Sequence, residues 1–306
     1  TQTWMSREAL KAHGQVWLDD YEREIASVNY PAYQEAMRKN PRMNMGDPFA
    51  DSFAEETLYG IGAKRQRELM EQLASAMEGQ PMLHYDNRPG CYYEYMLKKI
   101  AGVQARGVTW YQGESEVYHP ECYYELFQDM VAFWRSLWQQ ELPFYCVQLA
   151  PFQNWMDSYG TDFPVIRRLQ AEAVKQMSRA YLISSSDAGM RYDIHPKEKK
   201  PIGYRLGLAA LKYEYGKKVQ ADAPAAAAVY TKNNDLYIDF SGDMETLEVR
   251  GEEIQELQLF AEGFEGEQEI SFDAGDFNIE GTTLILRNAD IGGHRVSRAA
   301  FAWKDY

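Results

Sequence analysis

Two short polar segments contain the residues that could do chemistry in this chain. Gln112, Gly113 and Glu114 directly follow an apolar run, and His195 lies in the sequence Asp-Ile-His-Pro. The carboxamide of Gln112 can donate a hydrogen bond to the oxyanion that forms during acyl transfer. Imidazole titrates near neutral pH, so His195 is suited to accept a proton and return it. Gly113 lets the backbone turn sharply or approach a substrate closely.

Each segment also has a purely structural interpretation. Gln112 and Glu114 can cap the next helix and satisfy the loop backbone, and an isolated histidine more commonly makes a structural hydrogen bond. The other histidines have no ligand-like spacing: His13, His84, His119 and His294. The sequence contains no HExxH motif and no carboxylate cluster of the EF-hand type, so we expect no metal and no cofactor.

The predicted strands and helices that would position these residues alternate along the chain. Three apolar runs predict buried parallel strands: 107–111, 145–150 and 180–184. Apolar residues at helical spacing predict three helices, the last with Pro196 in its first turn: 122–138, 162–177 and 196–215. This order predicts an α/β fold with a parallel sheet covered by helices, whose carboxyl edge would hold both Gln112 and His195.

The pattern changes near an alanine-rich linker at 220–228. Beyond it, short segments of period two predict strands between glycine-containing turns: 235–240, 256–260, 268–272, 283–286 and 299–303. We therefore divide the chain into a domain of residues 1–219 and a small all-β, β-sandwich-like domain of residues 220–306. Towards the N-terminus, Ser6 is a predicted N-cap for a helix through Leu10, and 63–77 has the spacing of a surface helix.

Composition excludes several classes of partner. The 306 residues include 32 basic and 46 acidic side chains, and this net charge of −14 disfavours nucleic acid as a ligand. No run of about 18 apolar residues occurs, so we expect no membrane span. Cys91, Cys122 and Cys146 lie in no paired spacing, which predicts reduced thiols and favours a reducing compartment such as the cytoplasm.

In order and spacing, the chain resembles the sialate O-acetylesterase family of SGNH hydrolases. Trp-Tyr-Gln-Gly-Glu-Ser at 110–115 and Asp-Ile-His-Pro at 193–196 look like two of the family's sequence blocks. Further segments are similar to family segments along almost the whole chain: 4–10, 87–89 with Tyr93 and Met96, 124–138, 143–150, 195–211 and 301–303.

The resemblance implies a three-layer α/β/α SGNH-hydrolase-like sheet with a small C-terminal all-β domain, and hydrolysis of an acetylated sugar or oligosaccharide. It implies that a serine attacks the ester, that His195 acts as base and then acid, and that Gln112 supplies the side-chain donor of the oxyanion hole. Asp193 is our first choice for the carboxylate that orients His195 and Asp187 the second, and a dyad without a carboxylate is the third possibility. Glu114 is expected to contact either the substrate or the residues that surround the catalytic groups.

The chain also departs from the family pattern. It contains neither Gly-Gln-Ser-Asn nor Gly-Asp-Ser, so we expect the serine in a segment of the same protein upstream of Thr1. Glu116 stands where the family usually has Asn, and Glu94-Tyr95 where it usually has Asn-Gly. This added negative charge makes neutral acetylated xylan an alternative substrate to sialic acid. A non-catalytic carbohydrate-binding or scaffold protein of the same fold is the alternative function.

Overall fold

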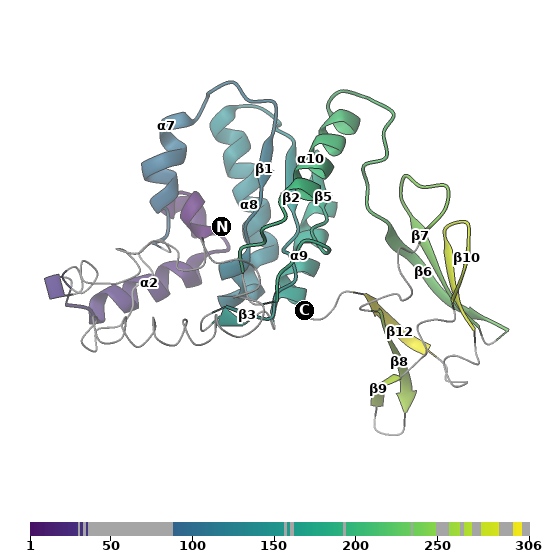
Figure 1. Ribbon diagram of the computed structural model, residues 1–306. Helices are drawn as coiled ribbons and strands as arrows, with labels where there is room; N and C mark the ends of the chain where they lie inside the picture. Colours follow the sequence, from purple (N-terminus) through teal and green to yellow (C-terminus); the bar gives the residue numbers. More distant parts are fainter. Residues whose placement is uncertain are drawn as a thin grey trace. The chain divides into compact units, whose positions relative to one another are not determined.

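Two compact units make up the described part of the chain, Thr1–Ile202 and Gly203–Asp305 (Figure 1). The predicted domain boundary between residues 219 and 220 stays a prediction. The computed structural model describes these residues: 1–29, 31–32, 35, 88–155, 158–159, 162–191, 194–233, 235–248, 257–263, 266–270, 277–287 and 296–301.

The first unit contains a parallel sheet of three strands in the order β1-β2-β5. β1 (Val108–Trp110) and β5 (Ala180–Ile183) flank β2 (Phe144–Val147), and all four residues of β2 are buried. The three predicted strands are thereby confirmed. Because the strands are parallel, their carboxyl ends lie at one edge of the sheet.

Two long amphipathic helices connect these strands. α8 (Pro120–Trp138) joins β1 to β2, and α9 (Phe163–Gln176) lies between β2 and β5 and packs against α8. A proline in the first turn begins each helix without losing an intrahelical hydrogen bond. The buried stripe of α8 forms much of the core beside the sheet: Tyr123, Leu126, Phe127, Met130, Val131 and Trp134.

An aromatic cluster fixes the N-terminal segment against this core. Trp4, in the short 3-10 helix η1 (Gln2–Trp4), lies 6.0 Å from the Trp110 ring of β1 and 5.9 Å from the Trp134 ring of α8. The indole Nε1 of Trp134 also donates to the Trp4 carbonyl at 3.1 Å. The residues before Trp4 are therefore held beside the carboxyl end of β1.

The predicted cap at Ser6 is confirmed. Its Oγ accepts a hydrogen bond from the backbone N–H of Ala9 at 3.1 Å at the start of α1 (Arg7–Leu10). The helix predicted at 63–77 lies outside the described residues. The unit also contains the longer helix α2 (Gln15–Ser27). Its remaining elements are short: π-helical η3 (Tyr93–Leu97), α7 (Lys98–Ile100), 3-10 helix η4 (Glu114–Tyr118), β3 (Asn154–Trp155) and β4 (Ser158–Tyr159).

The prediction that Pro196 begins the last helix is wrong. α10 (Lys200–Tyr213) begins four residues later, and Pro201 lies in its first turn. Proline lacks a backbone N–H, and the first helical turn is where that N–H needs no partner within the helix, so Pro201 fits the start as well as Pro196 would. His195 consequently lies in a bend rather than next to a helix.

The second unit contains two antiparallel sheets. Leu259 of β8 packs in one hydrophobic cluster with Leu236 and Ile238 of β7 and with Leu284 and Leu286 of β11, so the two sheets share a core. One sheet has the order β10-β11-β7-β6 and the other β12-β8-β9. Their bounds are β6 Ala225–Lys232, β7 Asp235–Ser241, β8 Leu257–Gly263, β9 Gly266–Ile270, β10 Phe277–Glu280, β11 Thr283–Leu286 and β12 Val296–Phe301.

The alanine-rich segment is not a linker. Ala225–Ala228 opens β6, which pairs antiparallel with β7 from end to end although every β6 side chain is exposed. Alanine is a poor strand former and buries nothing here, so the first half of the strand carried no signal. Val229, Tyr230 and Thr231 in its second half favour a strand, and the prediction overlooked them. The backbone hydrogen bonds offered by β7 decide its conformation. β10 was likewise not predicted.

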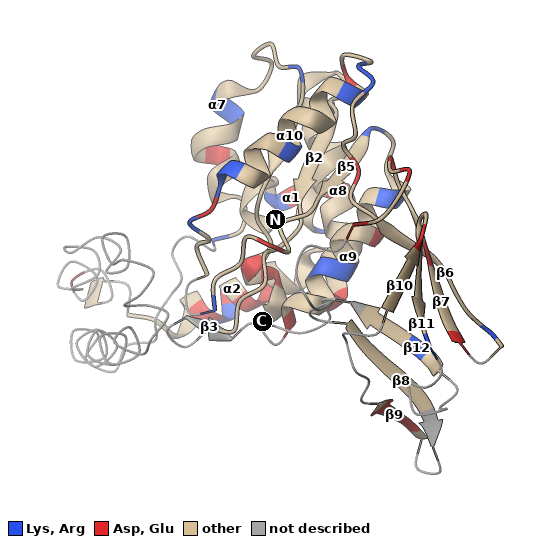
Figure 2. Cartoon of the chain, turned by 45° about the vertical axis from the view of Figure 1, so that its right-hand side comes forward, with Lys and Arg blue, Asp and Glu red and all other residues tan. Residues whose placement is uncertain are grey.

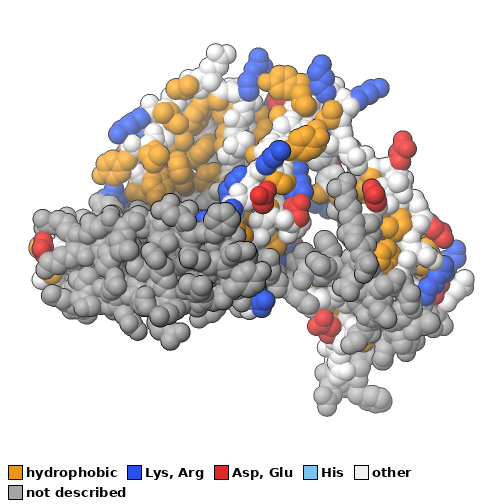
Figure 3. All heavy atoms as spheres, viewed as in Figure 1, with side chains coloured by type: hydrophobic (Ala, Val, Ile, Leu, Met, Phe, Trp, Pro, Cys, Tyr) orange, Lys and Arg blue, Asp and Glu red, His pale blue; other side chains and the backbone are white. Residues whose placement is uncertain are grey.

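Basic and acidic residues are interspersed along the described helices and strands (Figure 2). Ion pairs such as Arg168–Glu172 at 3.0 Å join neighbours one helical turn apart. Exposed apolar side chains gather on η3 and α7, over the upper left of the view in Figure 3: Tyr95, Met96 and Ile100. None of the described helices combines the length and apolar character needed to cross a membrane.

Candidate active site

The loop after β1 carries Gln112, Gly113 and Glu114 at the carboxyl edge of the sheet. Open parallel sheets bind their ligands at this edge. Gln148 follows β2 and Asp187 lies in the turn after β5, so polar residues follow all three strands there. The tertiary structure thus brings together segments that are separated by more than seventy positions in the sequence.

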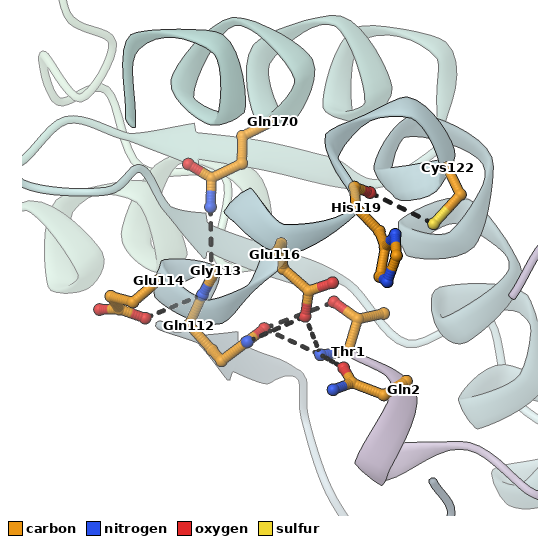
Figure 4. A network of polar contacts seen from close by, with 9 residues as sticks. All are labelled: Thr1, Gln2, Gln112, Gly113, Glu114, Glu116, His119, Cys122 and Gln170. Atoms are coloured by element: carbon orange, nitrogen blue, oxygen red, sulfur yellow. Dashed lines mark hydrogen bonds and ion pairs between the residues drawn. The ribbon is translucent and has the colours of Figure 1, made fainter. Parts of the chain in front are cut away.

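A buried glutamine from α9 joins two of these loops. Gln170 is fully buried, and its Nε2 donates to the carbonyl oxygen of Gln112 at 3.2 Å (Figure 4). Its Oε1 accepts from the backbone N–H of Leu149, just beyond β2, at 2.9 Å. One carboxamide therefore satisfies the half-buried carbonyl of Gln112 and the buried N–H of Leu149, and it fixes the backbone position of Gln112.

Position 113 requires a glycine, both for its backbone conformation and for the closeness of its neighbours. Its φ of +151° lies in a region that residues with a Cβ rarely adopt. A Cβ placed there would lie 3.0 Å from Nε2 of Gln170 and 3.3 Å from a methyl carbon of Leu149. The glycine thus allows Gln170 to approach the loop closely, as expected from the sequence for a sharp turn.

The side chain of Gln112 is held on both sides of its carboxamide. Its Nε2 donates to Oε1 of Glu116 at 3.0 Å. Its Oε1 accepts from the backbone nitrogen of Thr1 at 3.2 Å and from the Thr1 hydroxyl at 3.4 Å. Figure 4 shows these side chains converging from η1, the β1 loop and η4.

Glu116 is the residue of this network that the sequence interpretation misjudged. We expected it to add negative charge near the pocket, but its side chain is fully buried. Its Oε1 accepts a hydrogen bond from the backbone nitrogen of Thr1, which is itself buried. The only sequence signal was its departure from the family residue at this position, which marked the position as unusual without indicating a role.

Glu114 points away from the Gln112 carboxamide, and burial shifts the pKa of its carboxyl (Figure 4). Its Oε2 accepts from the backbone N–H of Gly113 at 2.9 Å. Burial raises the pKa of the Glu114 carboxyl above its usual value of 4.5, while hydrogen bonds from the backbone of Glu114 and Gly113 act to lower it.

The candidate partners of His195 are placed differently. His195 and Asp187 are both exposed, and both take part in polar interactions in the structure. Asp193 lies outside the described residues. The choice between Asp193 and Asp187 as the carboxylate that orients His195 stays a prediction.

Other side chains of this unit that could do chemistry are paired or buried. His119 lies between Asp20, at 2.7 Å from its Nε2, and Glu121, at 3.1 Å from its Nδ1. Cys146 is a free, buried thiol, and burial raises its pKa to about 12, so it is not a nucleophile near neutral pH. Among the described residues, no group of three or more His, Cys, Asp and Glu side chains could hold a metal ion.

Comparison with solved structures defines the class to which this fold belongs. The chain is similar to the crystal structure of a carbohydrate acetylesterase from Xanthomonas citri, with a TM-score of 0.61 and 25% sequence identity over 72% of this chain and 51% of that one. The chain therefore has the predicted fold class, an SGNH-hydrolase-like α/β parallel sheet followed by all-β strands.

Residues 3–210 match the model of a family described as carbohydrate esterase, sialic acid-specific acetylesterase. The chain belongs to this family. It is also similar to the sialate O-acetylesterases of rat, 26% identical over 49% of this chain and 31% of that protein, and of mouse, 26% identical over 52% and 33%. The human sialate O-acetylesterase is 27% identical over 47% of this chain and 32% of its own length. The matched region thus spans about a third of each curated relative.

Replacing Gly113 with alanine should destabilise the first unit. A residue forced into a sparsely populated backbone region costs about 1–3 kcal/mol, and the Gln170 contact adds to that cost. Urea denaturation measures the effect. Gly207→Ala is the control, because Gly207 lies in α10 with open space around it and should tolerate alanine. Equal stability of the two variants would contradict the role of Gly113.

Replacing Glu114 with glutamine should change how stability depends on pH. The raised pKa of Glu114 means that the folded state holds a proton that the unfolded state has lost above pH 4.5, so this carboxyl makes wild-type stability fall as pH rises. The wild type should therefore lose stability relative to Glu114→Gln between pH 4.5 and neutrality. Urea titrations at several pH values measure the difference, with exposed Glu125→Gln as control. A stability difference between the wild type and Glu114→Gln that does not change with pH would argue against a raised pKa of Glu114.

Proposed function

We propose that this chain is part of a carbohydrate O-acetylesterase that removes acetyl groups from sialic acid or another acetylated sugar. The observation that carries the proposal is the fixed carboxamide of Gln112 at the carboxyl edge of the sheet. Membership of the esterase family supports it. The attacking serine is contributed by a segment upstream of Thr1.

In the proposed mechanism, the serine Oγ attacks the acetyl carbonyl carbon while His195 takes the Oγ proton. The carbonyl oxygen becomes an oxyanion, and Nε2 of Gln112 donates a hydrogen bond to it. The ester bond then breaks, and the sugar oxygen leaves with the proton from His195. Water attacks the acetyl-serine by the same route in reverse, which releases acetate and restores the serine hydroxyl.

The proposal leaves two substrates that differ in charge, the anion acetylated sialic acid and neutral acetylated xylan. The case for neutral acetylated xylan depended on acidic residues at the pocket, but Glu116 is buried and accepts a hydrogen bond from Gln112. Glu94 pairs with Lys98 at 3.1 Å on η3 and α7. Burial keeps the Glu116 carboxylate away from a substrate, and Glu94 is paired with Lys98, so we favour acetylated sialic acid and retain xylan as the second substrate to test.

A non-catalytic carbohydrate-binding or scaffold protein is the alternative function. The observation in its favour is that neither Gly-Gln-Ser-Asn nor Gly-Asp-Ser occurs in the 306 residues. The coding sequence upstream of Thr1 distinguishes the two functions, because only the esterase requires a serine block there after an apolar strand.

Replacing His195 with alanine in a protein that includes the upstream segment should lower kcat by about 10²–10⁴-fold and leave KM nearly unchanged, because the base acts in the transition state. Hydrolysis of p-nitrophenyl acetate and of acetylated sialic acid measures both constants. His13→Ala is a matched control, since His13 is exposed and pairs with Asp129 at 2.7 Å. A His195→Ala enzyme with activity within tenfold of wild type would remove His195 from the mechanism.

Residues 1–306 alone should release almost no acetate. In subtilisin, an unrelated serine hydrolase, removal of the serine lowers kcat by about 10⁶-fold, because only binding and the oxyanion hole remain. Acetate release from acetylated sialic acid and acetylated xylan is measured with and without the upstream segment. Strong turnover by residues 1–306 would mean that a serine within them, such as Ser115 beside Glu114, is the nucleophile.

A further inference from the structure

We propose that Glu116 is a positioning residue that sets the orientation of the Gln112 carboxamide. This inference rests on the proposed function, because it concerns the donor that Gln112 offers to the oxyanion. Its structural basis is the hydrogen bond of 3.0 Å from Nε2 of Gln112 to Oε1 of Glu116. Glu116 itself touches neither the ester nor the serine in this scheme.

The two ends of the Gln112 carboxamide meet partners of opposite kind. The Thr1 nitrogen is a donor, both as an ammonium and as a peptide N–H, and it faces Oε1 of Gln112 at 3.2 Å. The Glu116 carboxylate is an acceptor, and it faces Nε2. A carboxamide turned by 180° would place oxygen against carboxylate and NH₂ against a donor. Both contacts would then be repulsive, so only one orientation is stable.

This orientation determines what Gln112 can offer to a substrate. One hydrogen of Nε2 is used by Glu116, and the second remains on the same nitrogen for an oxyanion. The turned orientation would present a carbonyl oxygen, which repels an oxyanion. An asparagine in place of Glu116 carries both a donor and an acceptor, so it would not discriminate between the two orientations.

Burial makes the Glu116 contact persistent. Its side chain is fully buried, and the adjacent backbone is held because the Glu116 N–H donates to the Gly113 carbonyl at 3.0 Å. The backbone of Gln112 is held independently by Gln170. With the backbone and one side of the carboxamide both fixed, the donor is placed before substrate arrives, which is the condition for effective oxyanion stabilisation.

A double-mutant cycle in a protein that includes the upstream segment tests the proposal. Glu116→Ala should lower kcat by about tenfold or more with KM little changed, and Gln112→Ala should lower it by about 10²–10³-fold. The double variant should equal Gln112→Ala, because Glu116 acts only through Gln112. Exposed Glu125→Ala is the control. The proposal would be overturned if Glu116→Ala lowered kcat as much in the Gln112→Ala background as in the wild type. It would also be overturned if Glu116→Ala did not lower kcat at all.

The side-chain amide signals of Gln112 in ¹⁵N NMR give a readout that does not require activity. Glu116→Ala should shift the Nε2 protons of Gln112, and Glu125→Ala should not. If the parent protein has no esterase activity, the proposed function fails while these signals still decide the positioning role. Unchanged Gln112 signals in Glu116→Ala would overturn it.

Glu116→Gln keeps the shape of the side chain and covers the case in which Glu116→Ala does not fold. Its amide can accept or donate, so we expect Gln112 to give two sets of amide signals and kcat to fall several-fold, less than in Glu116→Ala. A single, unshifted set of Gln112 signals together with wild-type kcat would show that the carboxylate does not set the orientation.

Discussion

The carboxamide of Gln170 is the contact on which the arrangement at the sheet edge depends. It donates to the Gln112 carbonyl and accepts from the Leu149 N–H, so it holds the loops after β1 and β2 in fixed relation. The Leu149 N–H would otherwise be buried without a partner, at a cost of about 1–3 kcal/mol. The absence of a Cβ on Gly113 makes this approach possible.

A second set of contacts joins the N-terminal segment to the same edge. The Trp4, Trp110 and Trp134 rings pack together, and this packing sets Thr1 beside Gln112 and Glu116. The side chain of Gln112 thus depends on residues from three separate parts of the chain. An oxyanion donor built in this way is held by the protein core rather than by the loop alone, which limits its motion before the ester binds.

Apolar periodicity was sufficient to predict the three parallel strands and the two long helices that connect them. β2, α8 and α9 each bury a continuous run or a helical stripe, so burial alone fixes their type. The predictions for the start of α10 and for the strand β6 were wrong. Two prolines were compatible with the first turn of α10, and the exposed alanines of β6 bury nothing that a sequence pattern could reveal.

The fold class, the family and the loop that carries Gln112 could all be predicted from the amino-acid sequence, because apolar patterns and motif residues are local properties of the chain. Which side chains meet could not, because those contacts depend on packing between distant segments. Glu116 was expected to be a charge at the pocket, and it is a buried partner of Gln112 and Thr1, since the aromatic packing of Trp4 closes the N-terminal segment over it. Gln170 carried no motif, and its role follows from the packing of α9 beside the sheet edge, a contact between residues 58 positions apart.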